Sequence, residues 1–169
     1  MTTPHSSLVA VDHDPSLETD ARELHRVLEA LLRVVQFRDR DRICCHDISV
    51  TQCYALQTLV DEGSMASNAL AESLFLDKST ASRVASALER KGYLLRHPDP
   101  EDGRAVLLEV TAAGRRLYRR IEADLVDEVA RLAADFEPDV RRDMTRLLGR
   151  LAAAAAGRVE RGGGCCRLR

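Results

Sequence analysis

The sequence predicts a mainly α-helical fold with one β-hairpin and long helices at both ends. Leu, Ala, Arg and Glu dominate the composition, aromatic residues make up only 4%, and Trp is absent. This mixture favours helices over a β-sandwich. The 169 residues, 45% of them hydrophobic, are enough for one domain with its own core and short tails.

The net charge of −2 gives no global attraction to nucleic acid or to a membrane surface. No apolar stretch approaches the roughly 18 residues of a membrane span. Residues 1–16 lack the basic and apolar regions of a signal peptide and are expected to form a flexible tail. We therefore expect a cytoplasmic protein without a membrane partner.

The first predicted helix runs from residue 17 to about residue 38. Its apolar residues recur at helical spacing: Leu17, Leu24, Val27, Leu28, Leu31, Val34 and Val35. The segment 38–48 breaks this pattern with charged residues and the run Cys44-Cys45-His46. A connection is therefore expected there.

Three helices are predicted next. Ser49 and Gln52 form a capping-box pattern at the start of the first, which ends near Gly63. A short helix is expected over residues 66–75. Asp77 or Lys78 opens the third, which Gly92 closes.

Two extended segments, residues 93–96 and 104–110, flank a polar loop that contains Pro and Gly. This pattern predicts a β-hairpin. Thr111 is expected to cap a long helix that reaches about residue 134. Pro138 opens a last helix that ends in the alanine run 152–156, and residues 157–169 are expected to be a flexible tail.

This order of elements, a helix, a short helix, a third helix and a two-stranded wing, is that of a winged helix-turn-helix. The DNA-binding core is expected over about residues 49–111. In that fold the helix from Lys78 lies in the major groove of double-stranded DNA. Between residues 76 and 96, five basic residues stand against two acidic ones. The expected DNA contacts are Lys78, Ser79, Thr80, Ser82, Arg83 and Arg96. Arg83 is the best candidate for reading a base, because Arg can bind guanine in a bidentate way.

Two motifs make the resemblance to a known family specific. One is Asp102-Gly103-Arg104 followed by an extended run that ends in Val110-Thr111, and the other is the helix start 76–83. Both resemble the MarR family of transcription regulators, and the resemblance covers residues 17–156.

The resemblance implies that Arg104 at the wing tip enters the minor groove and that Asp102 orients it. It also implies a homodimer, with dimerisation helices at about residues 17–38 and 111–156, because their apolar faces need a partner. A two-fold dimer matches a palindromic operator with half-sites about 34 Å apart. The expected activity is transcription repression.

A cysteine cluster is the part of the sequence that the family motifs leave unexplained. Cys44 and Cys45 precede a predicted helix, and Cys53 lies one turn inside it. Nearby arginines and the helix N-terminus would lower thiol pKa values, and thiolates select thiophilic ions. The site is interpreted as a sensor for trivalent arsenic or antimony, which resembles a cysteine-rich subtype of the family with a Cys-Cys-x7-Cys pattern.

Several alternatives stay open. The cluster could hold zinc, with His46 or Asp47 as the fourth ligand, or act as a redox switch. The cysteines could also be spectators in a regulator of an organic ligand, with Cys53 a small buried residue. Cys165 and Cys166, after three glycines, are possible additional ligands. No obligatory cofactor is expected.

A thiol enzyme is the alternative from a different class. The sequence has no Gly-rich phosphate loop, no G-x-S-x-G and no Cys-x-x-Cys pair. His46 cannot easily orient its ring toward the adjacent thiol, so an enzyme is not expected. The predicted mechanism is release of the repressor from DNA when a ligand joins Cys44, Cys45 and Cys53.

Overall fold

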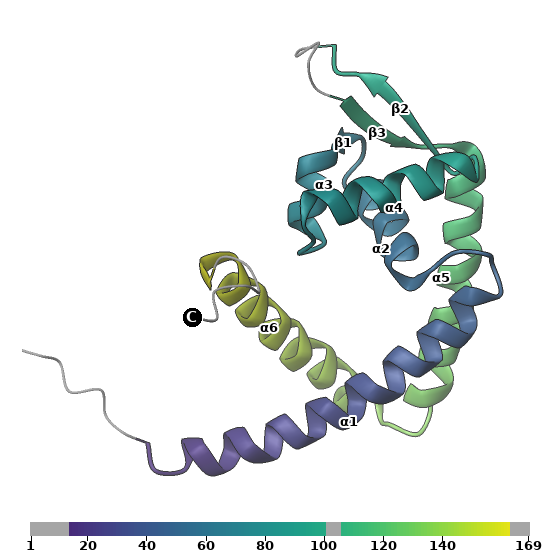
Figure 1. The fold of residues 1–169 in the computed structure, drawn as a ribbon. Helices are drawn as coiled ribbons and strands as arrows, with labels where there is room; N and C mark the ends of the chain where they lie inside the picture. Colours follow the sequence, from purple (N-terminus) through teal and green to yellow (C-terminus); the bar gives the residue numbers. More distant parts are fainter. Residues whose placement is uncertain (1–13, 101–105, 163–169) are drawn as a thin grey trace, which may run out of the picture. The chain divides into compact units, whose positions relative to one another are not determined.

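The computed structural model describes residues 14–100 and 106–162; the side chains of residues 44 and 159–162 are outside the description. The chain divides into two compact units, residues 1–38 and 39–169. Figure 1 shows the order of the elements, which is α1 (Leu17–Cys44), α2 (Val50–Asp61), β1 (Met65–Ala66), α3 (Ser67–Ser73), α4 (Lys78–Arg90), β2 (Leu94–Pro98), β3 (Val106–Val110), α5 (Ala112–Ala133) and α6 (Pro138–Gly162). The mainly helical fold with a hairpin is confirmed.

Helix α1 is longer than the sequence predicted. It continues to Cys44, six residues past the expected end at residue 38. The charged residues of this stretch interrupt the apolar pattern but are compatible with a helix, because Arg and Asp can remain at its surface. Ile43 is fully buried, and this residue keeps the extended helix end in the second unit.

The capping box at the start of α2 is confirmed. The Ser49 hydroxyl accepts from the Gln52 backbone N–H, and the Gln52 side chain accepts from the Ser49 N–H, both at 3.2 Å. These two bonds satisfy donors that the first helical turn leaves without an intrahelical partner. They fix where α2 begins, directly after the turn that carries Cys45.

The core of the second unit is formed by α2, α3, α4, α5 and the sheet. Its largest fully buried side chains are Ile43, Leu56, Leu59, Leu70, Leu88, Leu94, Leu108 and Ile121. Helix α2 contacts α3, α4, α5 and β3, so it lies at the centre of this packing. The core therefore holds α4 and the hairpin on one common support.

The sheet has three antiparallel strands in the order β1-β3-β2, not the two that the sequence predicted. The unpredicted strand β1 is two residues long and pairs Met65 with Leu108. Strands this short carry no alternation that a sequence can show. In the hairpin itself, Leu94 pairs with Val110 and Pro98 with Val106.

Helix α5 begins in close contact with the base of the hairpin. The Thr111 hydroxyl accepts from the Gly114 N–H at 3.0 Å and donates to the Gly92 carbonyl at 2.8 Å. A Cβ on Gly114 would lie 2.3 Å from the Tyr93 carbonyl oxygen. Only glycine allows this approach, which ties the end of α4, the hairpin and α5 together.

The last helix, α6, extends to Gly162, six residues beyond the predicted end at residue 156. A single glycine at position 157 costs about 1 kcal/mol in a helix and does not stop it. No helix among the described residues is both long enough and apolar enough to cross a membrane.

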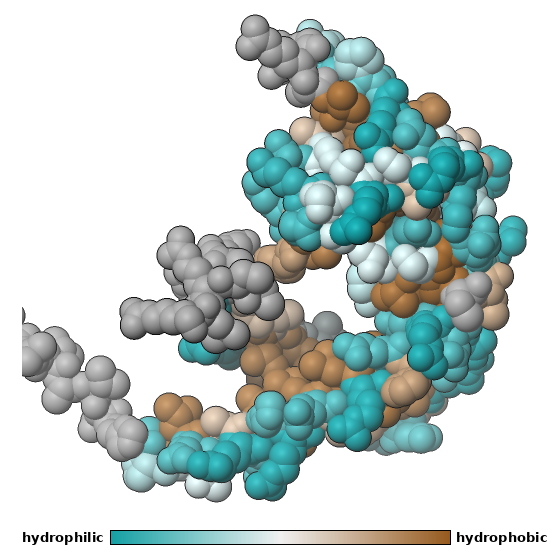
Figure 2. All heavy atoms as spheres, in the orientation of Figure 1, coloured by the Kyte–Doolittle hydropathy of each residue, from teal (hydrophilic) through white to brown (hydrophobic). Residues whose placement is uncertain are grey.

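The long helices expose many large apolar residues, part of the brown surface in Figure 2. In α1 the exposed ones are Leu17, Leu24, Val27, Leu31, Leu32, Val34 and Phe37. In α5 and α6 they are Val126, Val129, Leu132, Val140, Met144, Leu147 and Leu148. Single exposed apolar residues are common, but so many on a few helices mark interaction surfaces.

Candidate nucleic-acid interface

The N-terminus of α4 is organised by Asp77. Its carboxylate accepts from the Thr80 backbone N–H at 2.8 Å, from the Thr80 hydroxyl at 2.7 Å and from the Ser79 hydroxyl at 2.5 Å. The Ser79 hydroxyl, followed by the two bonds from Thr80, lowers the pKa of Asp77 well below its usual range. Asp77 is therefore an ionised N-cap that also sets the orientation of the two hydroxyls.

Three of the predicted DNA contacts lie on the exposed side of α4. Lys78, Ser79 and Arg83 are exposed. The Arg83 Nη2 donates to the Thr80 hydroxyl oxygen at 2.9 Å. A series of hydrogen bonds thus leads from Asp77 through Thr80 to Arg83 and holds the guanidinium over the N-terminal half of the helix.

The other three predicted contacts on these elements, Thr80, Ser82 and Arg96, are half-buried. Arg96 lies on β2, and its Nη2 donates to the Ser82 carbonyl oxygen at 3.2 Å and to the Ser86 hydroxyl at 2.8 Å. Its Nε lies 3.2 Å from a carboxylate oxygen of Glu89. The structure therefore turns Arg96 onto α4, and a DNA contact by Arg96 stays a prediction.

In the described part of the wing, the His97 Nε2 on β2 lies 3.3 Å from a carboxylate oxygen of Glu109 on β3. Asp102 and Arg104, predicted at the wing tip, lie outside the described residues, so their minor-groove role stays a prediction. The structure does bring the hairpin and α4 together, because Arg96 on β2 bonds to Ser82 and Ser86 of α4.

The turn between α1 and α2 holds Cys45, His46 and Asp47. The Cys45 thiol is exposed and donates to the Asp41 carbonyl oxygen at 3.3 Å. His46 is more buried than a loop histidine usually is, with a side chain 16% exposed and its Nε2 3.8 Å from Asp124 on α5. Asp47 has a φ of 59°, the left-handed conformation that closes such turns.

Cys53 is part of the core. It is only 3% exposed and belongs to the same buried cluster as Leu56 and Leu59. Burial, and then the nearby Asp39 carboxylate, raises the pKa of Cys53 to about 11. The expected lowering of the thiol pKa is therefore wrong at Cys53, because loss of water outweighs any favourable effect of the helix N-terminus.

The described residues contain no group of three His, Cys, Asp or Glu side chains that could hold a metal ion. The side chain of Cys44 and the tail residues Cys165 and Cys166 lie outside the description. The three-thiol site of Cys44, Cys45 and Cys53, with His46 as a possible further ligand, stays a prediction.

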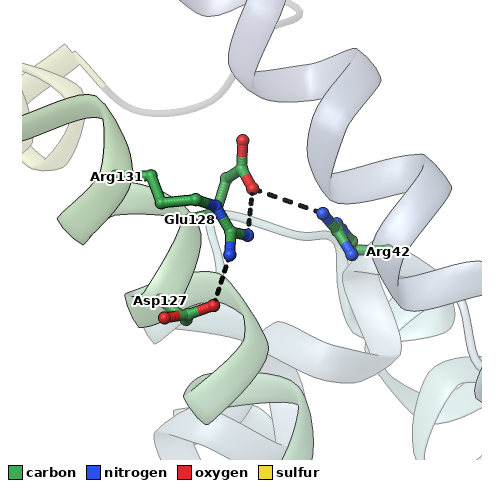
Figure 3. A network of polar contacts seen from close by, with 4 residues as sticks. All are labelled: Arg42, Asp127, Glu128 and Arg131. Atoms are coloured by element: carbon green, nitrogen blue, oxygen red, sulfur yellow. Dashed lines mark hydrogen bonds and ion pairs between the residues drawn. The ribbon is translucent and has the colours of Figure 1, made fainter.

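A polar network that the sequence analysis missed joins the end of α1 to α5. Figure 3 shows Glu128 between two guanidinium groups, at 3.2 Å from Arg42 and 2.6 Å from Arg131. Asp127 adds a further bond to Arg131 at 2.6 Å. Hydrogen bonding to Arg131 is the main cause that lowers the pKa of Glu128. The contact between Arg42 and Glu128 joins residues 86 positions apart, so no local sequence pattern predicts it.

Comparison with known proteins agrees with this geometry. The sequence model of the MarR family matches residues 48–106, which include α2, β1, α3, α4 and β2. An uncharacterized HTH-type transcriptional regulator of Mycobacterium leprae is 32% identical over 139 residues, covering 78% of this chain and 94% of that protein. The homoprotocatechuate degradative operon repressor of Escherichia coli is 24% identical over 115 residues, 68% of this chain and 78% of that protein.

Solved structures show the same fold. A MarR family protein from Bacillus stearothermophilus superposes with a TM-score of 0.75 at 22% identity, over 82% of this chain and 96% of that one. The PcaV transcriptional regulator from Streptomyces coelicolor, solved with its natural ligand, gives a TM-score of 0.59 at 30% identity, over 74% of this chain and 91% of that one. The chain belongs to the MarR family of winged helix-turn-helix transcription regulators, which bind DNA.

Proposed function

We propose that the chain forms a homodimeric repressor that inserts both copies of α4 into successive major grooves of a palindromic operator. The observation that carries this proposal is the exposed set of Lys78, Ser79 and Arg83 at the capped N-terminus of α4. A related protein is a repressor of a degradative operon. Repression follows when the bound dimer covers a promoter.

The chemistry of this surface suits DNA. Lys78 and the Ser79 hydroxyl can bond phosphate oxygens, and the positive end of the α4 dipole favours the same anions. Arg83 already has its guanidinium held by Thr80. Exchanging that single bond for two bonds to a guanine edge supplies base recognition.

The apolar residues of the long helices support the dimer. Leu147 and Leu148 on α6 are 53% and 47% exposed, and Val129 on α5 is 49% exposed. Charged substitutions at an apolar interface are strongly unfavourable. Leu147→Asp is therefore expected to give monomers in size-exclusion chromatography with light scattering. Leu95→Asp changes an equally exposed leucine on β2 and is expected to leave the dimer intact; a dimeric Leu147→Asp would contradict this interface.

DNA binding is tested by fluorescence anisotropy with the duplex from upstream of the gene. Arg83→Ala is expected to weaken operator binding by about tenfold or more, the effect of losing a bidentate base contact. Arg22→Ala removes the same charge from an exposed ion pair in α1 and serves as the matched control. Equal affinities of the two variants would overturn the role of α4.

The effector part of the proposal concerns the cysteine turn. We propose that a thiol-reactive ligand, in the first place trivalent arsenic or antimony, binds Cys44, Cys45 and Cys53 and releases the operator. Cys53 is buried and protonated in the present fold, whereas a metalloid needs accessible thiolates. The ligand would therefore prefer a conformation in which the start of α2 has moved, and this preference is what shifts the equilibrium.

Two contacts support coupling between that turn and the DNA-binding surface. Lys91, at the C-terminal end of α4, pairs with Asp47, and His46 lies beside Asp124 on α5. A displacement of the turn acts directly on the orientation of α4. A bound ligand is also a feature of the regulator from Streptomyces coelicolor, which was solved with its natural ligand.

A further inference from the structure

Arg96 joins the hairpin to α4. It is the third residue of β2, and its side chain is 28% exposed. The guanidinium contacts three residues of α4: the Ser82 carbonyl at 3.2 Å, the Ser86 hydroxyl at 2.8 Å and the Glu89 carboxylate at 3.2 Å.

The three partners lie on one side of α4. Residues 82, 86 and 89 follow each other at intervals of four and three, so they form a row along the helix axis. Ala81, Ala85 and Leu88 form the fully buried side. The exposed Lys78, Ser79 and Arg83 remain outside this contact.

We propose that Arg96 is a positioning residue for DNA recognition: it fixes α4 against the β2–β3 hairpin so that both meet the operator in register. This inference rests on the proposed DNA-binding function. It assigns Arg96 a role through α4, in place of the phosphate contact that its charge predicts.

The guanidinium group is suited to this task in a way that lysine is not. Its planar fork presents several donors at fixed angles, so one side chain can reach a carbonyl, a hydroxyl and a carboxylate together. A lysine ammonium at the same position keeps the charge but cannot span the three partners. Arg96→Lys therefore separates positioning from simple electrostatic attraction.

Salt dependence separates the two roles quantitatively. A phosphate contact contributes to counterion release, and each one lost lowers the slope of log K against log salt by about 0.9. Loss of a phosphate contact also weakens specific and non-specific DNA binding alike. Loss of a positioning contact leaves the slope and the non-specific affinity unchanged. It weakens only binding to the operator, where α4 and the hairpin must both fit.

The experiment measures anisotropy of operator and scrambled duplexes at several salt concentrations with the full chain. The variants are Arg96→Met, which removes the charge and so tests the salt slope, Arg96→Lys, which keeps the charge, and Ser86→Ala, which removes only one hydroxyl and keeps the core intact. Positioning predicts a loss of about tenfold in operator affinity for Arg96→Lys and a smaller loss for Ser86→Ala, with unchanged slopes and unchanged scrambled-duplex affinity.

A double-mutant cycle completes the design. The combined variant is expected to lose less than the sum of the single losses, because both changes break the same contact. Full operator affinity in Arg96→Lys would overturn the positioning role. The role would also be overturned if Ser86→Ala bound like wild type and the effects of the two changes were additive in the combined variant. A wild-type protein that binds neither duplex overturns the proposed DNA-binding function, and this inference with it.

Discussion

The Lys91 ammonium joins the end of α4 to the turn that carries Cys45. It donates to the Asp47 carbonyl oxygen and lies 3.6 Å from the Asp47 carboxylate. Lys91 is the C-cap residue of α4, and its side chain is 30% exposed. Two residues 44 positions apart thus connect the proposed effector site to the proposed DNA-binding surface.

Lys91→Met is expected to weaken the response to the effector more than DNA binding itself. The methionine keeps most of the side-chain volume but loses both contacts with Asp47, so a change in the turn no longer moves α4. The arsenite concentration for half-maximal release of the operator should rise by about fivefold or more, the size of an ordinary coupling between sites.

Arg90→Met is the matched control for this prediction, since it removes the same charge from the neighbouring exposed position. It should change affinity for DNA through charge alone and leave the arsenite midpoint where it was. Equal midpoints in the Lys91 and Arg90 variants would show that the contact with Asp47 does not transmit the signal.

The raised pKa of Cys53 predicts a loss of stability in alkali. The neutral thiol is favoured in the fold, so its contribution is fully present below the ordinary pKa of 9 and is lost as the pH rises toward the folded-state value of about 11. Between these values the free energy of unfolding should fall by up to about 1.4 kcal/mol per pH unit from this group.

Urea unfolding of wild type and Cys53→Ala between pH 8 and 10 measures this effect. The alanine variant should be less stable at pH 8 but lack this part of the decline. Tyr118, whose pKa burial raises to about 12, contributes only above its ordinary value of 10, so it adds little in this window. Parallel pH curves would show that Cys53 ionises as readily in the fold as in the unfolded chain.

Gly114→Ala is expected to destabilise the protein by about 1–3 kcal/mol, the usual effect of overpacking. The added Cβ would lie 2.3 Å from the Tyr93 carbonyl oxygen, and backbone cannot give way as a flexible side chain can. Gly149→Ala is the control, because no described atom outside the adjacent backbone of its own helix lies within 4 Å of the added Cβ. It should gain stability from helix propensity. Equal unfolding free energies for both variants in urea would contradict the close approach at Gly114.

Asp77→Ala is expected to lower both the thermal midpoint and operator affinity, because it removes the helix cap and the support of Thr80 beneath Arg83. Asp77→Asn keeps a capping oxygen and should retain most of the stability. Since the folded-state pKa of Asp77 is lowered, the advantage of wild type over the alanine variant should disappear as the pH falls below the ordinary value of 3.8. A pH-independent difference in midpoint would exclude the ionised cap.

The sequence predicted most of the architecture because its signals are local. Ser49 and Gln52 define the start of α2, and Thr111 defines the start of α5 through its side chain. The exposed positions of Lys78 and Arg83 on α4 were also predicted from local signals. Each of these depends on residues within one or two helical turns.

What the sequence missed depends on contacts between distant residues. The extension of α1 to Cys44 is stabilised by the burial of Ile43, and β1 exists only because Met65 meets Leu108. The inward orientation of Arg96 follows from β2 packing on α4. The raised pKa of Cys53 has the same origin, because burial is set by the tertiary fold and has no pattern in the nearby residues.

The most direct test of the account follows release from DNA by thiol-reactive ligands. Reduced wild-type protein on its upstream duplex is titrated in anisotropy with arsenite, antimonite, Zn²⁺ or peroxide, beside Cys44→Ser, Cys45→Ser and Cys53→Ser variants. The account predicts release by micromolar trivalent metalloid, reversal by a competing dithiol, and loss of the response in the serine variants. Three results would contradict the metalloid-responsive cysteine site: release by Zn²⁺ or peroxide alone, no response to any ligand, or an unchanged response in every serine variant.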